Sequence, residues 1–349
     1  MIPSSQHTDN ASDSYSRNNQ SMKLIKSEYV LGSEHFQDWE AKHPNTQWIV
    51  ISGNVSYDQY RQFDMDFDYT KYRRITIEDV NVQKYVYENG YEATFEDVCE
   101  SHVYNYDCKL SVLTKLVLGK DKDYVVSEQS VYSCDGKTLY HMEEAKEITI
   151  QKNVEHIGDF AFANYDTLSA IQFVDGLKSI GKWAFRGTGL GVIELPDSLA
   201  SLGEGAFCTS DAEKVKLPRF LEVIPSECFC LCLIAKISIP NSVKIIESCA
   251  LRGNFFSHID IPEGVEKIEY NAFDQLDSIS LPSTLKEIAD DFYYEDCIDD
   301  PQNVPYITVH PDNPIFFSKD GTLYYRESGN VATKCKYTKK VLPCNLSSS

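Results

Sequence analysis

Cysteine is the most reactive side chain in this sequence, and three cysteines crowd into CFCLC, residues 228–232. A structural zinc site needs four converging ligands, usually supplied as C-x-x-C pairs, and no second pair follows this stretch. Cys208 and Cys230 lie 22 residues apart. A disulfide between them is one interpretation, and two free thiols are the other, which we favour. We therefore predict no metal site at CFCLC.

The acidic stretch FDMDFD spaces Asp64, Asp66 and Asp68 as a calcium-binding loop would. Such a loop also requires glycine at its sixth position and glutamate at its twelfth. Tyr69 and Ile75 occupy those positions here. We interpret the three carboxylates as part of a solvated loop that holds no calcium.

The stretch GLKSIGKW, residues 176–183, contains the glycines and the lysine of a phosphate-binding loop. The position that should be serine or threonine, to hold the metal, is Trp183. The chain also lacks G-x-S-x-G, H-E-x-x-H and dinucleotide-binding patterns. We predict no catalytic, cofactor-binding or metal-binding residue, and therefore no enzyme and no cofactor.

The elements that position these side chains follow from a repeated phrase, I-x-[IL]-P-x-x-[VL]-x-x-[IL]-x-x-x-A-F. Its first apolar residue recurs at spacings of 23, 22, 22, 22, 22 and 20, at Ile148, Ile171, Ile193, Val215, Ile237, Ile259 and Ile279. The alternation I-x-I predicts a short strand, and the proline that follows ends it. One unit cannot bury its own apolar side, so we expect neighbouring units to stack around a shared core.

The Ala-Phe ending of the phrase predicts a column of aromatic side chains inside this stack. The column contains Phe162, Phe185, Phe207, Phe229, Leu251 and Phe273. The last repeat departs from the pattern with Phe292 and Tyr293, and the acidic EDCIDD follows. We interpret that departure as a widened loop near the C-terminal end of the stack.

The phrase resembles the repeats of the BspA-like leucine-rich-repeat family, closely over residues 148–285. Two Asp-Gly hairpins, residues 132–142 and 317–327, and a strand–Gly–helix unit, residues 48–63, are similar to flanking features of that family. We predict an α/β, β-rich fold: a right-handed leucine-rich-repeat solenoid with a parallel concave sheet and irregular N- and C-terminal caps. The resemblance implies a cell-surface or secreted role in adhesion to host or matrix proteins.

The expected domain boundaries follow the change from irregular to repeated sequence. Residues 1–44 are mostly polar and predicted to be largely disordered, and residues 45–140 to be an irregular N-terminal cap with strand-like TKYRRITIEDV and LTKLVLG. Residues 141–310 hold the repeats, and residues 311–349 a C-terminal cap and tail.

The net charge of −20, from 33 basic and 53 acidic residues, excludes several partners. It opposes binding to nucleic acid phosphates, and no apolar run is long enough for a membrane span. The N-terminus has neither the basic start nor the apolar core of a secretory signal. The protein is therefore cytosolic, or a signal lies outside this chain.

Function is expected on the residues that flank the second isoleucine of each strand, because they point away from the core. They place Lys214, Lys216 and Lys236 in a basic spot, with Glu194, His258 and Asp260 beside it. We predict a docking point there for an anionic group of a partner protein. The alternative is a cross-strand charge ladder that keeps the face soluble.

A second candidate is a set of tyrosines in the N-terminal cap: Tyr85, Tyr87, Tyr91, Tyr104 and Tyr106. We favour a role in covering the open end of the stack over an exposed platform for sugar or peptide. The sequence as a whole predicts a non-enzymatic, adhesin-like protein-binding module. A cytosolic leucine-rich-repeat scaffold or effector is the alternative.

Overall fold

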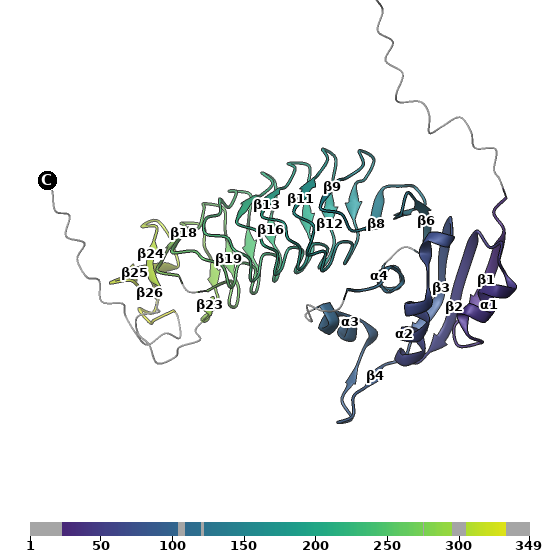
Figure 1. The fold of residues 1–349 in the computed structure, drawn as a ribbon. Helices are drawn as coiled ribbons and strands as arrows, with labels where there is room; N and C mark the ends of the chain where they lie inside the picture. Colours follow the sequence, from purple (N-terminus) through teal and green to yellow (C-terminus); the bar gives the residue numbers. More distant parts are fainter. Residues whose placement is uncertain (1–22, 104–108, 120–121, 275, 295–304, 333–349) are drawn as a thin grey trace, which may run out of the picture.

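The computed structural model describes residues 23–103, 109–119, 122–274, 276–294 and 305–332. These residues contain twenty-six strands but only four α-helices and one 3-10 helix. The fold is β-rich and leucine-rich-repeat-like, with extensive parallel strand pairing. Figure 1 shows an N-terminal α/β unit at one end, a long stack of repeat units, which we call coils, and a β-hairpin at the other end.

The N-terminal unit is a parallel layer of alternating strands and helices. Its elements are β1 (Lys26–Val30), α1 (Phe36–Lys42), β2 (Trp48–Val55), α2 (Tyr57–Asp66), the 3-10 helix η1 (Tyr69–Lys71) and β3 (Arg74–Val82). The three strands pair in parallel in chain order. The predicted strand–Gly–helix unit is β2 and α2, and a capping box at Ser56 begins the helix.

The prediction of disorder through residue 44 is wrong for residues 26–42, which form β1 and α1. Tyr29, Phe36 and Trp39 are buried in one aromatic cluster, and the indole nitrogen of Trp39 donates to a backbone carbonyl of β1 at 3.1 Å. Each aromatic ring removes a large apolar area from water, which outweighs the polar composition around it. The rest of that predicted segment, residues 1–22, lies outside the described residues.

The segment that follows is regular, although the sequence predicts an irregular cap. Its elements are β4 (Tyr85–Val86), β5 (Glu92–Ala93), α3 (Phe95–Val103), α4 (Val112–Leu118), β6 (Asp123–Ser127), β7 (Ser130–Ser133) and β8 (Thr138–Met142). LTKLVLG forms most of α4 rather than a strand, because Ser111 caps a helix that buries Leu113 and Leu116 on one side. The predicted Asp-Gly hairpin at residues 132–142 is the β7–β8 pair.

One hydrogen-bonded sheet joins the N-terminal unit to the coils. Its strand order is β1-β2-β3-β6-β7-β8-β10-β12-β14, where β10 (His156–Ile157), β12 (Ser179–Ile180) and β14 (Ser201–Leu202) belong to the first coils. The pairing is antiparallel from β3 to β8 and parallel elsewhere. Tyr132 and Leu139, from β7 and β8, belong to the same hydrophobic core as the coils. The first coil therefore packs against an antiparallel meander, which covers its open end.

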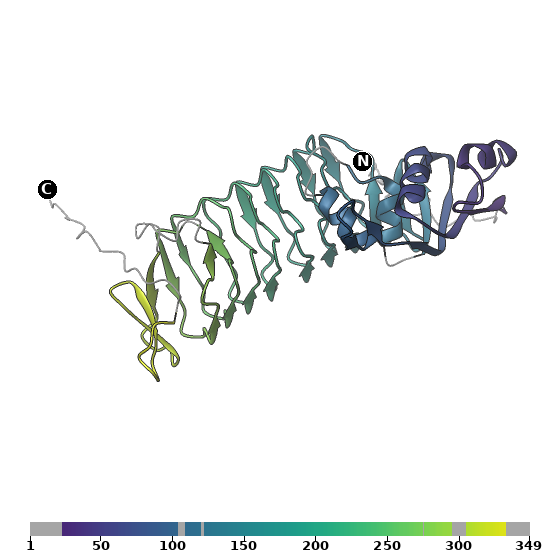
Figure 2. The same cartoon turned by 90° about the horizontal axis from the view of Figure 1, so that it is seen from below.

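Most coils contribute one short strand to each of two parallel ladders (Figure 2), and each ladder is divided into shorter hydrogen-bonded sheets. The IxI ladder contains β9 (Glu147–Thr149), β11 (Ala170–Gln172), β13 (Val192–Glu194), β15 (Lys214–Lys216), β18 (His258–Asp260), β21 (Ser278–Leu281) and β24 (Tyr306–Val309). The second ladder contains β10 (His156–Ile157), β12 (Ser179–Ile180), β14 (Ser201–Leu202), β16 (Val223–Ile224), β17 (Ile245–Ile246), β19 (Lys267–Ile268) and β22 (Glu287–Ile288). Pairs such as Ile193 with Val215 stand in register, so equivalent residues of successive coils share one core.

The predicted aromatic column is present. It follows the Ala-Phe turns of successive coils, which lie outside both ladders. The rings of Phe162, Phe185, Phe207 and Phe229 stack in sequence with centroids 4.8, 5.1 and 5.4 Å apart, and all four side chains are buried. Backbone hydrogen bonds follow the same column, for example from Phe207 N to the carbonyl of Cys228 at 2.9 Å.

Each Ala-Phe turn begins with a left-handed backbone residue, which the sequence does not reveal. These residues have φ between 49° and 60°, and they are Phe160, Trp183, Gly205, Glu227, Cys249 and Asn271. Gly205, and to a lesser degree Asn271, are of residue types that favour this conformation. The repeated inter-coil hydrogen bonds hold the other four in place.

The stack ends in short paired elements. β20 (Phe273–Asp274) pairs in parallel with β23 (Tyr293–Tyr294), and β25 (Phe316–Lys319) forms the predicted second hairpin with β26 (Thr322–Tyr325). Asn313 donates to the carbonyls of Pro282 and Leu285, which ties the hairpin to the last coils. The predicted widened loop falls mainly on residues 295–304, outside the described residues.

Candidate functional site

The six predicted site residues lie together on one surface, which we call the IxI face. It consists of the outward side chains of the IxI ladder and of residues 236–238. Glu194 is opposite Lys216 in the pairing of β13 with β15, and Lys216 forms a bridge with Ser238 in the next coil. Isoleucine and valine between these positions turn inward, so the charged residues turn outward and are exposed.

The three lysines of the basic spot have no ion-pair partner within 4.0 Å among the described residues. Some lysines elsewhere on the coils do pair, as Lys286 does with Glu266 at 2.6 Å, whereas Lys146, Lys152 and Lys244 form no ion pair either within the described part of the chain. Glu194 also forms no ion pair with Lys216, although the two stand opposite each other. The positive charge of the spot is therefore available to an external group.

His258 and Asp260 form a separate polar pair beside the lysines. Nε2 of His258 lies 2.9 Å from Oδ1 of Asp260, and Nδ1 lies 2.8 Å from the hydroxyl of Ser278. The hydrogen bond from His258, reinforced by one from Ser280, lowers the pKa of Asp260 below its ordinary value. Asp260 is therefore held as a carboxylate whose position is fixed by its neighbour.

The IxI ladder has one interruption between β11 and β13 and a second between residues 236–238 and β18. At the second interruption no backbone hydrogen bond joins the two segments, both of which the structure describes, whereas β18 pairs normally with β21 on its other side. A hollow of about 610 Å³ opens there, and Lys236, His258 and Asp260 are among the residues that line it. Sequence reasoning missed this hollow, because Ile237 and Ile259 keep the repeat pattern on both sides of it.

The predicted tyrosine cap is wrong for Tyr85, Tyr87 and Tyr91. They lie on the β4–β5 hairpin, which projects away from the coils (Figure 1), and Tyr91 is 66% exposed. The meander of β7 and β8 covers the end of the stack instead. Tyr104 and Tyr106 lie outside the described residues.

The acidic stretch is not a solvated loop throughout, because Asp64 is buried in α2. Its carboxylate accepts hydrogen bonds from Ser111 and Thr114, and burial raises its pKa. Asp66 accepts from Gln62, and Asp68 caps η1. The three carboxylates thus have separate structural roles.

Two further features concern chemistry that the sequence raised. Cys208 and Cys230 are free thiols and line a cavity of about 400 Å³ together with Cys249. No group of three or more potential metal ligands was found within the described residues.

The helices described here are too short or too polar to cross a membrane.

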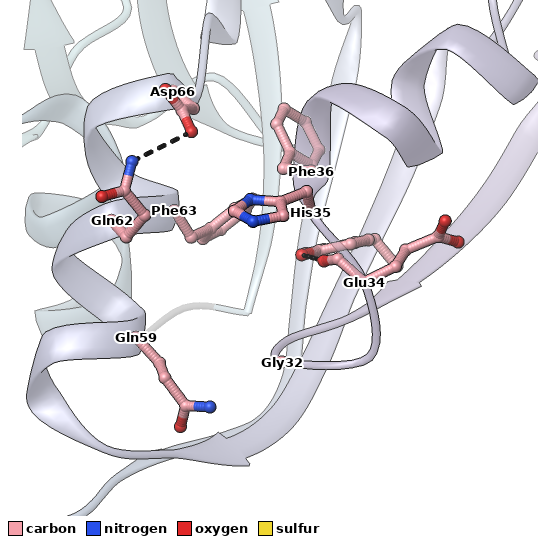
Figure 3. Close-up of a pocket in the computed structure, with 9 residues that line it drawn as sticks. Gly32, Glu34, His35, Phe36, Gln59, Gln62, Phe63 and Asp66 are labelled. Atoms are coloured by element: carbon pink, nitrogen blue, oxygen red, sulfur yellow. Dashed lines mark hydrogen bonds between the residues drawn. The ribbon is translucent and has the colours of Figure 1, made fainter.

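A pocket in the N-terminal unit was not predicted from the sequence. Figure 3 shows it between α2 and the turn that connects β1 to α1, with a volume of about 300 Å³. His35 and Gln59 lie at its polar rim, and Gln62 donates to Asp66 across one side. The buried ring of Phe63 contributes to its lining.

Comparison with known proteins identifies the repeats. A family model for the BspA type leucine-rich repeat region matches in six copies, over residues 133–254 and 200–306. No curated relative matches the chain. The matched family model indicates no catalytic activity.

Solved structures that are similar to this chain include the following three. A leucine-rich repeat protein from Bacteroides ovatus is 22% identical with a TM-score of 0.32, over 50% of this chain and 58% of that one. A leucine-rich repeat protein from Eubacterium ventriosum is 14% identical with a TM-score of 0.38, over 69% and 59% respectively. The pneumococcal vaccine antigen PcpA is 19% identical with a TM-score of 0.23, over 59% and 41%. The chain spans less than two thirds of each of these proteins.

Proposed function

We propose that this chain, which belongs to the BspA-type leucine-rich-repeat family, is a non-enzymatic module that binds another protein through its IxI face. We further propose that its coils form a right-handed solenoid with the IxI ladder on the concave side. Connections between parallel strands of one sheet are right-handed in almost all proteins.

The unpaired basic spot is the observation that carries this proposal. Lys214, Lys216 and Lys236 are exposed on a chain whose net charge is −20, and none forms an ion pair among the described residues. A local charge of opposite sign steers an acidic partner group to one place and raises its association rate. Asp260 repels anions that approach in the wrong register, which adds specificity.

The proposed setting is the cell surface or the exterior, with host or matrix proteins as partners. This part rests on the BspA-type repeats and on the role expected of that family. A cytosolic scaffold or effector is the second candidate. Cys208 and Cys230 line one cavity, and their redox state in the isolated protein separates the two settings, because thiols persist in reducing compartments and disulfides form outside the cell.

Protease treatment of intact source cells separates the two settings. If the protein is outside, peptides from the repeats are released into the medium without lysis, together with those of a known surface protein. A known cytosolic protein must remain intact as the control. Release of repeat peptides only after lysis would overturn the surface proposal and favour the cytosolic one.

A further inference from the structure

The β4–β5 hairpin, residues 84–93, projects from the N-terminal unit (Figure 1) and carries exposed apolar and aromatic side chains. Val86 is 58% exposed, Tyr87 37% and Tyr91 66%. The hairpin is nevertheless ordered by its own hydrogen bonds, including Tyr87 N to the carbonyl of Tyr91 at 2.9 Å. Its base is held by the ring of Tyr85 against Tyr57, with centroids 5.1 Å apart. A preorganised aromatic knob of this kind loses little entropy when it binds.

This aromatic hairpin carries a net negative charge. Glu88 lies near the tip without an ion-pair partner among the described residues, and Glu92 pairs with Lys84 at 3.4 Å. Glu96 and Asp97 follow at the start of α3. The complementary surface must therefore combine positive charge with a recess for an aromatic side chain.

The IxI face has both properties at the hollow beside β18. Lys236 lines the hollow, and Lys214 and Lys216 lie on the neighbouring strand. Ile237, Phe256 and Ile259 are among the apolar residues that line the hollow, and the exposed side chains of Leu233 and Phe255 precede the two segments that border it. The same chain thus carries an acidic aromatic knob and a partly apolar hollow that lies beside three unpaired lysines, of which Lys236 lines it together with His258 and Asp260.

The two surfaces cannot meet within one molecule. Figure 1 places β4 at the foot of the N-terminal unit, whereas β13 and β18 lie along the upper side of the stack. We propose that the aromatic hairpin of one copy docks into the hollow of a second copy, with Tyr91 in the hollow and Glu88 against Lys236. This inference rests on the proposed binding face and names a second copy of the chain as its partner.

The contact uses different surfaces on the two copies, so it is heterologous. Such contacts continue from copy to copy unless the rotation closes a ring. The charge of −20 on each copy opposes association at low salt. At an ionic strength of about 0.15 M the Debye length is about 8 Å, so the overall repulsion is screened while close pairs persist. Self-association is therefore weak at low salt and increases towards that ionic strength.

Sedimentation velocity of the full chain over a wide concentration range tests this inference. The weight-average mass of the wild type is expected to rise with concentration. Glu88→Lys and Lys236→Glu should each lower the association constant about tenfold or more, and the two changes in one chain should restore it. Tyr91→Ser should weaken association similarly, whereas Tyr270→Ser, which alters an exposed tyrosine on the coils, should not.

Three results would overturn the inference: a single monomeric mass at all concentrations, association that Tyr91→Ser and Lys236→Glu leave unchanged, or no recovery in the double variant. Its failure is distinct from failure of the proposed function. A strictly monomeric wild type whose lysine variants still lose binding to a matrix protein removes only the self-association. If the wild type self-associates, but the lysine variants bind a matrix protein as well as the wild type does, only the proposal of an external partner is removed.

Discussion

Lys115 is fully buried where the N-terminal unit meets the first coils, a position that its sequence context does not reveal. Its ammonium group donates to the carbonyl of Ala161 at 3.3 Å and lies 4.7 Å from the ring centre of Tyr165. Burial, with a smaller effect of Lys109, lowers the pKa of Lys115 from 10.5 to about 7. His141 nearby is neutral at these pH values, because burial lowers its pKa to about 2.

The low pKa of Lys115 predicts a pH-dependent stability. Between about pH 7 and pH 10 the unfolded chain binds one more proton at this site than the folded protein, so stability rises with pH across that window. Below about pH 7 Lys115 is charged in the folded protein, so the buried charge lowers the free energy of unfolding by its full amount. Lys115→Met should therefore stabilise the protein by about 1–4 kcal/mol near neutral pH, and the gain should shrink towards pH 10.

Guanidinium unfolding of the wild type and Lys115→Met at several pH values between about 6.5 and 10 measures this effect. Lys152→Met, at an exposed site in the first coil, serves as the control and should change neither stability nor its pH dependence. A Lys115→Met variant that is less stable than the wild type at neutral pH would contradict the account.

At the scale of single elements, the aromatic column predicts a large cost for truncation. Phe207 stacks between Phe185 and Phe229 and is fully buried, so Phe207→Ala should destabilise the protein by about 3–5 kcal/mol. Phe207→Leu should cost much less, because Leu251 already occupies the column in another coil. Thermal or denaturant unfolding tests this, with Phe220→Ala as a control at a ring that is 68% exposed. Equal losses for Phe207→Ala and Phe220→Ala would exclude a packed column.

The second ladder requires a close approach of backbones at Gly203. A methyl group added there would lie within 3.0 Å of backbone atoms of Gly181 and Lys182 in the preceding coil. Gly203→Ala should therefore destabilise the stack by about 1–3 kcal/mol through strain. Gly191→Ala is the matched control, since nothing lies within 4 Å of its added methyl group. Indistinguishable unfolding midpoints for the two variants would show that the coils are not packed this closely.

The stacked strands and the left-handed turns of the coils differ in how far the sequence predicts them. The spacing of Ile193, Val215 and Ile259 predicts stacked strands, because inward residues must be apolar and regularly placed. The left-handed turns at Trp183 and Glu227 give no such signal, since tertiary hydrogen bonds rather than glycine hold them. Short apolar runs such as LTKLVLG are ambiguous between strand and helix, and here the cap at Ser111 selects the helix.

At the scale of the whole molecule, the positions of the site residues were predictable but their surroundings were not. Strand alternation alone places Lys214, Lys216 and Lys236 on one face. The interruption beside β18 depends on backbone hydrogen bonds, and the repeat pattern is unbroken there. The direction of the aromatic hairpin depends on packing against Tyr57, a contact between residues far from the repeats.

The central claim is that the IxI face binds a protein through its three unpaired lysines. The most direct measurement is binding of the labelled full chain to immobilised extracellular matrix at about 0.15 M salt. The triple variant K214E/K216E/K236E is compared with K152E/K244E/K319E, which changes the charge equally at exposed lysines outside this face. The account predicts saturable wild-type binding that the first variant weakens about tenfold or more and the second retains. Equal binding by the wild type and both variants would contradict it.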